Sequence, residues 1–199
     1  VDSSPLTLEE THALLAECVR AGGDAARVHT GDPGLYGAVA EQAALLDRDG
    51  IAWEVVPGVT AAFAAAAAAG VGFTAPGVSQ SLILTRAPGR TPVPEAESLR
   101  SLAAHGCALA VYLSAAQARA VQDELLAGGL PPDTPVVVGH RVGWPDGAVR
   151  RTTLEGLAEA AQGLGRQTVF LVLPGLGKDA ERSRLYAPDF AHGFRPARD

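Results

Sequence analysis

The pattern of apolar and polar positions in the first part of the chain predicts helices that alternate with short strands. Apolar residues recur at helical spacing after Thr7, and Glu10 completes a capping box with Thr7, so a helix is expected from residue 8 until Gly22 interrupts it. The other elements expected here are a strand at 26–29, a helix at 36–49, a strand at 51–56 and a helix at 60–69. This alternation is typical of a parallel α/β sheet.

The pattern changes after Pro76 and Gly77, where we place the boundary between two predicted domains, 1–77 and 78–199. Strands are expected in the second domain at 79–86, 108–113, 135–140, 148–152 and 168–173, with helices at 97–105, 114–127 and 154–161. Ser114 is expected to cap the second of these helices, with Gln117 completing a capping box. Trp-Pro-Asp-Gly at 144–147 predicts a hairpin turn. The fold class predicted is α/β, with two α/β domains.

One uncharged, alanine-rich stretch, residues 55–73, approaches the ~20 residues that cross a bilayer. It is interrupted by Pro57, Gly58, Gly70 and Gly72, and alanine is barely favourable in lipid. A buried helix with a turn on each side is therefore the better interpretation. The chain opens without a basic segment followed by an apolar one, so no signal peptide is expected.

Composition and charge exclude several classes of protein. The chain has 199 residues, 47% of them apolar and 19% charged, which is enough for a sizeable core and excludes global disorder. A formal net charge of −6 argues against a nucleic-acid binder. Cys18 and Cys107 lack metal-ligand spacing, which favours buried thiols in a reducing cytoplasm. The histidines form no metal motif and no G-x-S-x-G elbow is present, so neither a metal site nor a serine hydrolase is expected.

Two glycine-containing loops are candidates for ligand binding. Gly-Asp-Pro-Gly at 31–34 follows the strand expected at 26–29, and glycine lets a ligand approach the main chain closely. Residues 57–61 repeat this arrangement one strand later, with the Thr60 hydroxyl at the start of a helix. The alternatives are a plain strand-to-helix connection for the first loop and tight helix packing for the second. Neither loop carries a dinucleotide or P-loop motif.

Three arginines lie at the ends of predicted elements. Arg86 and Arg90 flank a loop rich in glycine and proline, and Arg141 follows a strand. The planar guanidinium group pairs bidentately with carboxylates, so these residues suit a carboxylate clamp. The alternative for each of them is an ordinary solvated surface residue.

Several segments form a recognisable set. They are His-Thr-Gly-Asp-Pro-Gly-Leu-Tyr-Gly-Ala at 29–38, Glu-Val-Val-Pro-Gly-Val-Thr-Ala at 54–61 and Tyr-Leu-Ser at 112–114, with more specific stretches at 78–94 and 183–195. Together they resemble the tetrapyrrole methylase family, the S-adenosylmethionine-dependent enzymes of corrin and sirohaem synthesis. Members of that family have two α/β domains with the methyl donor in the cleft between them, and the resemblance implies the same arrangement here.

The resemblance also implies site residues and partners. Contacts to S-adenosylmethionine would come from Thr30, Gly31, Asp32, Leu35, Thr60, Ala61, Leu113 and Val142. A tetrapyrrole substrate carries several carboxylates, which gives Arg86, Arg90 and Arg141 a role as cationic anchors. The expected protein is a cytoplasmic homodimer that acts on a tetrapyrrole, with no metal and no membrane or nucleic-acid partner.

The implied reaction is methyl transfer to a ring carbon. The donor is already reactive, so the chain is expected to hold methyl group and carbon in line, and no catalytic residue is assigned. Open alternatives are a neighbouring corrin-ring or uroporphyrinogen methylase, methylation of a modified histidine in a translation factor or of ribosomal RNA, and non-catalytic binding of the donor. Family members begin with a strand and a G-x-G-P-G-D loop, so roughly fifty residues of the family pattern before Val1 have no counterpart in this sequence.

Overall fold

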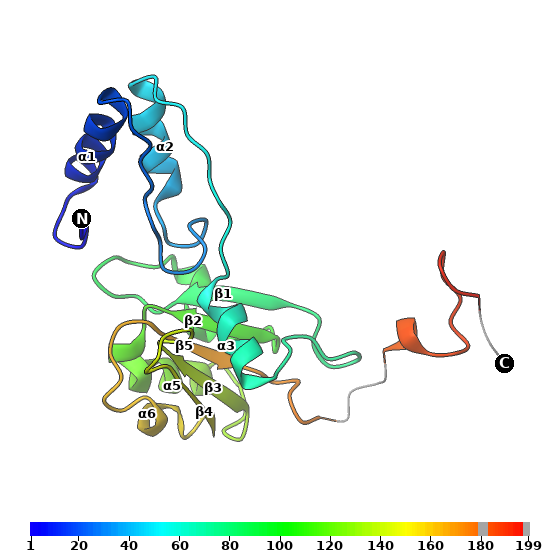
Figure 1. Cartoon of the computed structure of the whole chain (residues 1–199). Helices are drawn as coiled ribbons and strands as arrows, with labels where there is room; N and C mark the ends of the chain where they lie inside the picture. Colours follow the sequence, from blue (N-terminus) through cyan, green and yellow to red (C-terminus); the bar gives the residue numbers. More distant parts are fainter. Residues whose placement is uncertain (179–182, 197–199) are drawn as a thin grey trace. The chain divides into compact units, whose positions relative to one another are not determined.

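The computed structural model describes residues 1–178 and 183–196 (Figure 1). The chain divides into two compact units, Val1–Thr60 and Ala61–Asp199, named unit 1 and unit 2. The alanine-rich helix belongs to unit 2 because it packs on the sheet of that unit, so the units divide at an earlier residue than the predicted domains. The α/β class is confirmed, and the domains 1–77 and 78–199 stay a prediction.

Unit 1 contains two helices, α1 (Leu8–Arg20) and α2 (Val39–Arg48). The predicted capping box begins α1: the Glu10 N–H donates to Thr7 Oγ1 over 3.2 Å, and the Thr7 N–H donates to Glu10 Oε2 over 2.7 Å. α2 begins later than the predicted residue 36, because Tyr36 and Ala38 have φ angles of 56° and 52°. A right-handed helix needs negative φ, so it starts only after these two residues.

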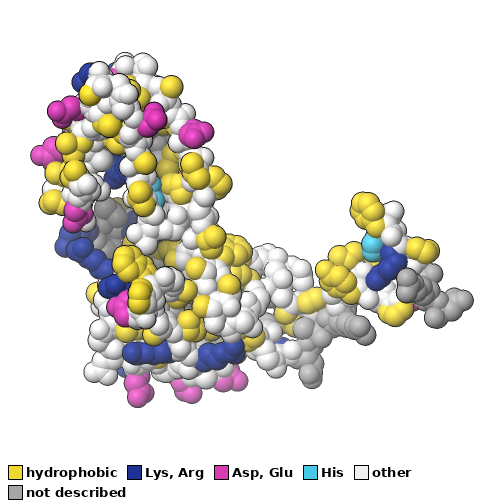
Figure 2. All heavy atoms as spheres, in the orientation of Figure 1, with side chains coloured by type: hydrophobic (Ala, Val, Ile, Leu, Met, Phe, Trp, Pro, Cys, Tyr) yellow, Lys and Arg dark blue, Asp and Glu magenta, His cyan; other side chains and the backbone are white. Residues whose placement is uncertain are grey.

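The strands predicted at 26–29 and 51–56 are wrong. Both segments lie outside the sheet, and no described strand pairs with either of them. Their apolar side chains stay exposed, with Val28 90% and Val56 71% accessible, and Figure 2 shows hydrophobic side chains on the surface of unit 1. The apolar pattern indicates which side chains favour burial, but a strand also needs a neighbour for its backbone groups. Within the described part of unit 1 no such neighbour is present.

A buried histidine links the two helices of unit 1. His12 of α1 is 8% exposed, and its Nε2 donates to Asp49 Oδ2 over 2.8 Å, just after α2 ends. The other carboxylate oxygen of Asp49 accepts from Arg48 Nε over 2.8 Å, and Arg20 Nη2 lies 3.5 Å from Oδ2. The hydrogen bond from Arg48, followed by the one from His12, holds the pKa of Asp49 well below its ordinary value of 3.8.

Replacing Asp49 with asparagine is expected to lower the urea midpoint of unfolding at neutral pH. A carboxyl group with a lowered pKa in the folded chain stabilises it above the unfolded value of 3.8, and this effect is lost as the pH falls toward the folded value. The difference in midpoint between the parent and Asp49→Asn should therefore be constant near neutral pH and shrink below about pH 4. Asp123→Asn, at an exposed position of the helix α5 (Ala118–Ala127) in unit 2, is the control and should leave the midpoint unchanged. A difference that persists undiminished in acid would contradict this role for Asp49.

Unit 2 is built on one five-stranded sheet in the order β1-β2-β5-β3-β4. Its strands are β1 (Leu82–Arg86), β2 (Ala108–Tyr112), β3 (Pro135–His140), β4 (Ala148–Thr153) and β5 (Thr168–Val172). β1 and β2 are parallel, and the other neighbouring pairs are antiparallel. All five strands were predicted, and the predicted turn at 144–147 joins β3 to β4 in a hairpin.

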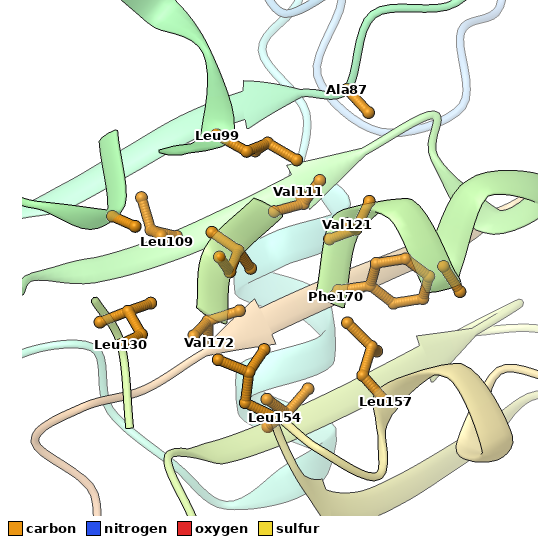
Figure 3. Close-up of a cluster of buried hydrophobic side chains, with 14 of the residues drawn as sticks. Ala87, Leu99, Leu109, Val111, Val121, Leu130, Leu154, Leu157, Phe170 and Val172 are labelled. Carbon is orange, nitrogen blue, oxygen red and sulfur yellow. The ribbon is translucent and has the colours of Figure 1, made fainter. Parts of the chain in front are cut away.

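One face of this sheet carries the main hydrophobic core. The helical elements of unit 2 are α3 (Ala61–Ala69), η1 (Glu95–Glu97), α4 (Leu99–Ala103), η2 (Ala115–Gln117), α5 (Ala118–Ala127), α6 (Leu157–Ala160) and η3 (Arg184–Tyr186). Val111 and Phe170 project from the strands into the core, where they lie near Val121 of α5 and Leu157 at the start of α6 (Figure 3). Val138 of β3 belongs to the same buried cluster. The three helices predicted for this part are therefore present, although each is shorter than expected.

The alanine-rich helix α3 packs on the opposite face of the sheet. Gly139 follows Val138 in β3, so it faces away from the main core, and a Cβ at this position would lie 2.7 Å from Cβ of Ala65. The small side chains thus let the helix approach the sheet closely. The Arg151 guanidinium donates to the carbonyl oxygen of Ala69 at the helix C-terminus. Among the described residues no helix is long and apolar enough to cross a membrane.

Gly139→Ala is expected to lower the free energy of unfolding by about 1–3 kcal/mol, the usual cost of an overpacked interior. The new methyl group would press on Ala65, whose side chain has no alternative rotamer, so the helix itself would have to move. Urea denaturation checks this result. Gly165→Ala is the matched control, because a Cβ there has no neighbour within 4 Å and its φ lies outside the left-handed region. Equal midpoints for the two variants would show that the contact between α3 and β3 is loose.

Candidate functional site

The two glycine loops singled out in the sequence are in contact within unit 1. Asp32 joins them: its Oδ2 accepts from the Gly58 N–H over 2.9 Å, and its Oδ1 accepts from the Gly34 N–H over 2.8 Å. These hydrogen bonds, first the one from Gly58 and then the one from Gly34, lower the pKa of Asp32 below its ordinary value of 3.8. The carboxylate is therefore charged at neutral pH and ties the second loop to the first.

A close approach of backbone to backbone makes glycine necessary at position 58. A Cβ on Gly58 would overlap the carbonyl oxygen of Gly31, and it would lie 3.0 Å from that carbonyl carbon and 3.3 Å from Cα of Asp32. All three atoms belong to the backbone, so no side chain can rotate away. Gly31 has a φ of 92°, which favours glycine there as well.

In unit 1 the residues predicted to contact S-adenosylmethionine lie together around this junction. Thr30 and Gly31 precede Asp32 directly, and the Leu35 N–H donates to the Asp32 carbonyl oxygen over 3.3 Å in a turn. Thr60 lies two residues after Gly58 and is half-buried. The residues that the sequence placed in two separate loops thus form one local arrangement.

Some residues other than glycine have a left-handed backbone conformation, and two of them are predicted site residues. In the described part of the chain they are Tyr36, Ala38, Leu113, Arg141 and Gln167. Leu113, with a φ of 53°, follows β2 with 70% of its surface exposed, and Arg141, with a φ of 46°, follows β3. Strained backbone of this kind clusters at ligand sites, so the conformations of Leu113 and Arg141 support their selection from the sequence.

In unit 2 two hydroxyl groups organise the carboxyl ends of the parallel strands β1 and β2. The prediction that Ser114 caps a helix is wrong: its Oγ donates to the Tyr112 carbonyl oxygen over 2.6 Å and accepts from the Ala87 N–H over 2.9 Å. The hydroxyl joins the two strand ends and makes no hydrogen bond to the N–H groups of the helical turn that follows it. Tyr112 Oη accepts from the Ala62 N–H over 3.0 Å, which ties the end of β2 to the first turn of α3.

These contacts include residues that the sequence-based site left out. Tyr112 and Ser114 belong to the Tyr-Leu-Ser segment that carried the resemblance, and both are buried. The signal available was a pair of hydroxyl side chains at the end of an otherwise apolar strand. Of the other predicted donor contacts, Ala61 opens α3, and a Cγ of Val142 would lie 3.3 Å from a Cβ on Gly139, on the same face of the sheet as α3.

The three predicted substrate arginines differ in their surroundings. Arg86 donates to the carbonyl oxygens of its own loop. Arg141 Nε lies 3.0 Å from Asp146 Oδ1, and its guanidinium stacks 4.8 Å from the ring centroid of Trp144. Arg90 is exposed and has no hydrogen bond or ion pair within the described residues. Arg90 is therefore the one of the three whose guanidinium is available to an incoming carboxylate.

Each unit, taken by itself, presents groups of a kind that can contact a ligand. In unit 1 the junction of the two glycine loops is polar backbone joined by the Asp32 carboxylate, and in unit 2 Leu113 offers an exposed apolar side chain. S-adenosylmethionine combines polar and flat apolar parts, since it has an amino acid moiety, a ribose and an adenine ring. Among the described residues there is no group of three or more His, Cys, Asp or Glu side chains arranged to hold a metal ion.

Comparison with known proteins identifies the family. The model for the Tetrapyrrole (Corrin/Porphyrin) Methylases matches residues 1–158. A Priestia megaterium protein named cobalt-precorrin-4 C(11)-methyltransferase is 46% identical over 194 residues, which cover 94% of this chain and 75% of that protein. The solved structure of a cobalt precorrin-4 methyltransferase, described as a cobalamin biosynthetic enzyme, aligns with a TM-score of 0.85 and 44% identity, covering 89% of this chain and 75% of that one.

A more distant structure shares the fold. The uroporphyrin-III C-methyltransferase of Thermus thermophilus, solved with S-adenosylhomocysteine, aligns with a TM-score of 0.68 and 27% identity over 83% of this chain and 72% of that one. The mixed α/β sheet and these matches together define a methyltransferase. The chain belongs to the family of tetrapyrrole (corrin/porphyrin) methylases.

Proposed function

We propose that the chain transfers a methyl group from S-adenosylmethionine to C11 of precorrin-4 or cobalt-precorrin-4, giving the corresponding precorrin-5 and S-adenosylhomocysteine in cobalamin biosynthesis. The observation that carries this proposal is the 46% sequence identity, over 94% of this chain, with a relative named for the reaction. The close structural match to a second enzyme of the same name supports it.

S-adenosylmethionine supplies a methyl group on a positively charged sulfur, which leaves with the electron pair of the broken carbon–sulfur bond. The chain's own work is to bind and orient, because well-placed reactants can save about 7–11 kcal/mol of the barrier. We place the donor against Thr30, Gly31, Asp32, Leu35, Thr60, Ala61, Leu113 and Val142. Two observations support this placement. The two glycine loops are joined by the hydrogen bond from Gly58 to Asp32, and Leu113 has an exposed side chain and a left-handed backbone conformation.

The acidic tetrapyrrole needs cationic partners, and we assign that role to the arginines at the strand ends. Arg90 contacts a substrate carboxylate directly, because its guanidinium has no other partner within the described residues. Arg141 shares its charge with Asp146 and offers its stacked guanidinium as a second anchor. No side chain is assigned as a nucleophile, since the substrate carbon itself attacks the methyl group.

We further propose that the enzyme works as a homodimer in the cytoplasm. Cys18 and Cys107 are free thiols in the structure, and free thiols are typical of a reducing compartment; Cys107 is buried as expected, whereas Cys18 is only half-buried. Sedimentation equilibrium tests the assembly: the proposal predicts twice the chain mass of 20.3 kDa, and a single-chain mass at micromolar concentration would contradict it.

A turnover assay with purified chain tests the proposed reaction. S-adenosylhomocysteine should be released with precorrin-4 or cobalt-precorrin-4 and S-adenosylmethionine, and not with uroporphyrinogen III. Release with uroporphyrinogen III alone would assign the chain to the activity for which its Thermus relative is named. Tight binding of S-adenosylhomocysteine with no turnover of any tetrapyrrole would indicate a donor-binding protein without catalysis.

A further inference from the structure

Arg86, the last residue of β1, holds the loop that follows this strand through hydrogen bonds to the loop backbone. Arg86 Nη1 donates to the carbonyl oxygens of Ala87 over 3.3 Å and of Thr91 over 3.2 Å, and Nη2 donates to that of Pro92 over 2.8 Å. Both ends of the guanidinium fork thus face the loop backbone. No lysine or neutral side chain reproduces three donors in this planar arrangement.

A second anchor fixes the beginning of the same loop. Ser114 Oγ, 1% exposed, accepts from the Ala87 N–H and donates to the end of β2. The Gly89 N–H also donates to the Thr91 carbonyl oxygen over 3.2 Å, closing a turn around residue 90. The loop at 87–94 is therefore clamped at Ala87 and again at 91–92, and Arg90 lies on the exposed turn between the two clamps.

We propose that Arg86 is a positioning residue for the substrate: it orders the 87–94 loop through the three carbonyl oxygens and so presents Arg90 to a carboxylate of the tetrapyrrole. This role rests on the proposed function and revises the simpler idea that Arg86 itself clamps a carboxylate. A direct clamp needs free N–H groups aimed outward. Both Nη1 hydrogens and one Nη2 hydrogen of Arg86 already point to carbonyl oxygens of the loop.

Limited trypsin digestion tests the loop-ordering part without any assay of activity. Trypsin cuts after arginine, so the Arg90–Thr91 bond reports how often the loop opens, and cleavage there can be mapped by mass spectrometry. Arg86→Gln and Arg86→Lys should both raise the cleavage rate at this bond by about tenfold or more. Ser114→Ala should raise it in the same direction. Arg100→Gln is the matched control, because it removes an arginine of the same unit whose guanidinium, among the described residues, pairs only with Glu124 at the surface.

Substrate kinetics test the part that concerns Arg90. Arg90→Gln and Arg86→Gln should each raise KM for the tetrapyrrole about tenfold or more, with the Kd for S-adenosylhomocysteine unchanged. Because both changes act on one interaction, the double variant should be no worse than either single one. Arg86→Lys should also resemble Arg86→Gln, whereas a direct charge clamp would be partly rescued by lysine.

The possible outcomes distinguish the loop-ordering role of Arg86 from direct contact with the substrate and from the proposed function. Unchanged cleavage at Arg90–Thr91 in both Arg86 variants would overturn the loop-ordering role, whatever the enzyme's substrate. Faster cleavage with additive KM effects, or with KM restored by lysine, would show that Arg86 touches the substrate itself. Faster cleavage with no turnover of any tetrapyrrole would retain the ordering of the loop and refute the proposed function.

Discussion

Gly58→Ala is expected to lower the affinity for S-adenosylhomocysteine by about 100-fold, which corresponds to about 2.7 kcal/mol. The added methyl group would overlap the carbonyl oxygen of Gly31, and neither partner can move without moving backbone. The second loop must then separate from the first, and the hydrogen bond from the Gly58 N–H to Asp32 is lost with it. The residues of the two loops that we assign to S-adenosylmethionine would then no longer be placed so that they can contact it together.

Isothermal titration with S-adenosylhomocysteine measures this effect. Gly165→Ala provides the control, because a Cβ at this position has no neighbouring atom within 4 Å, and this variant should bind as tightly as the parent. The urea midpoint of the variant checks that it is folded. Parental affinity in a folded Gly58→Ala protein would mean that the donor does not depend on the junction of these loops.

Asp32→Asn is expected to weaken S-adenosylhomocysteine binding by about 10- to 100-fold, the range for lost hydrogen bonds to a charged group. Asparagine has the same size but only one acceptor oxygen, so its amide N–H₂ must face either the Gly58 N–H or the Gly34 N–H. Two donors opposed at this distance repel, and one of the two links is broken.

The pair of substitutions gives a sharper test than either alone. Gly58→Ala and Asp32→Asn break the same contact, so the double variant should bind about as weakly as the worse single variant. Fully additive losses would show that Asp32 contacts the donor by some other route than through Gly58. Asp24→Asn, an exposed aspartate of the same unit, serves as the charge-matched control and should leave the affinity unchanged.

The sequence predicted unit 2 well because its elements carry their own local pattern. All five strands of the sheet and the turn at 144–147 follow from apolar runs separated by turn residues. In unit 1 the same reasoning failed for 26–29 and 51–56. An apolar run indicates only that a segment favours burial, whereas strand pairing depends on a partner distant in sequence. Val28 and Val56 are exposed for that reason.

The candidate site was predicted in part for a similar reason. The glycine loops were visible as motifs, but the bond from Gly58 to Asp32 joins residues 26 positions apart, which no local pattern reveals. Ser114 looked like a helix cap because a hydroxyl before a helix usually is one, yet its partner is Ala87, which directly follows the neighbouring strand β1. Arg86 carried the expected charge, and only the structure shows that its guanidinium faces its own loop.

The position of the transferred methyl group tests the central claim most directly. The chain is incubated with precorrin-4 and S-adenosylmethionine whose methyl carbon is an NMR-active isotope, and the product is examined by carbon NMR. We expect a single enriched methyl signal assigned to C11, with an equal amount of S-adenosylhomocysteine. Enrichment at another ring carbon, or on none while the donor binds normally, would contradict the assignment of the chain as a precorrin-4 C11-methyltransferase.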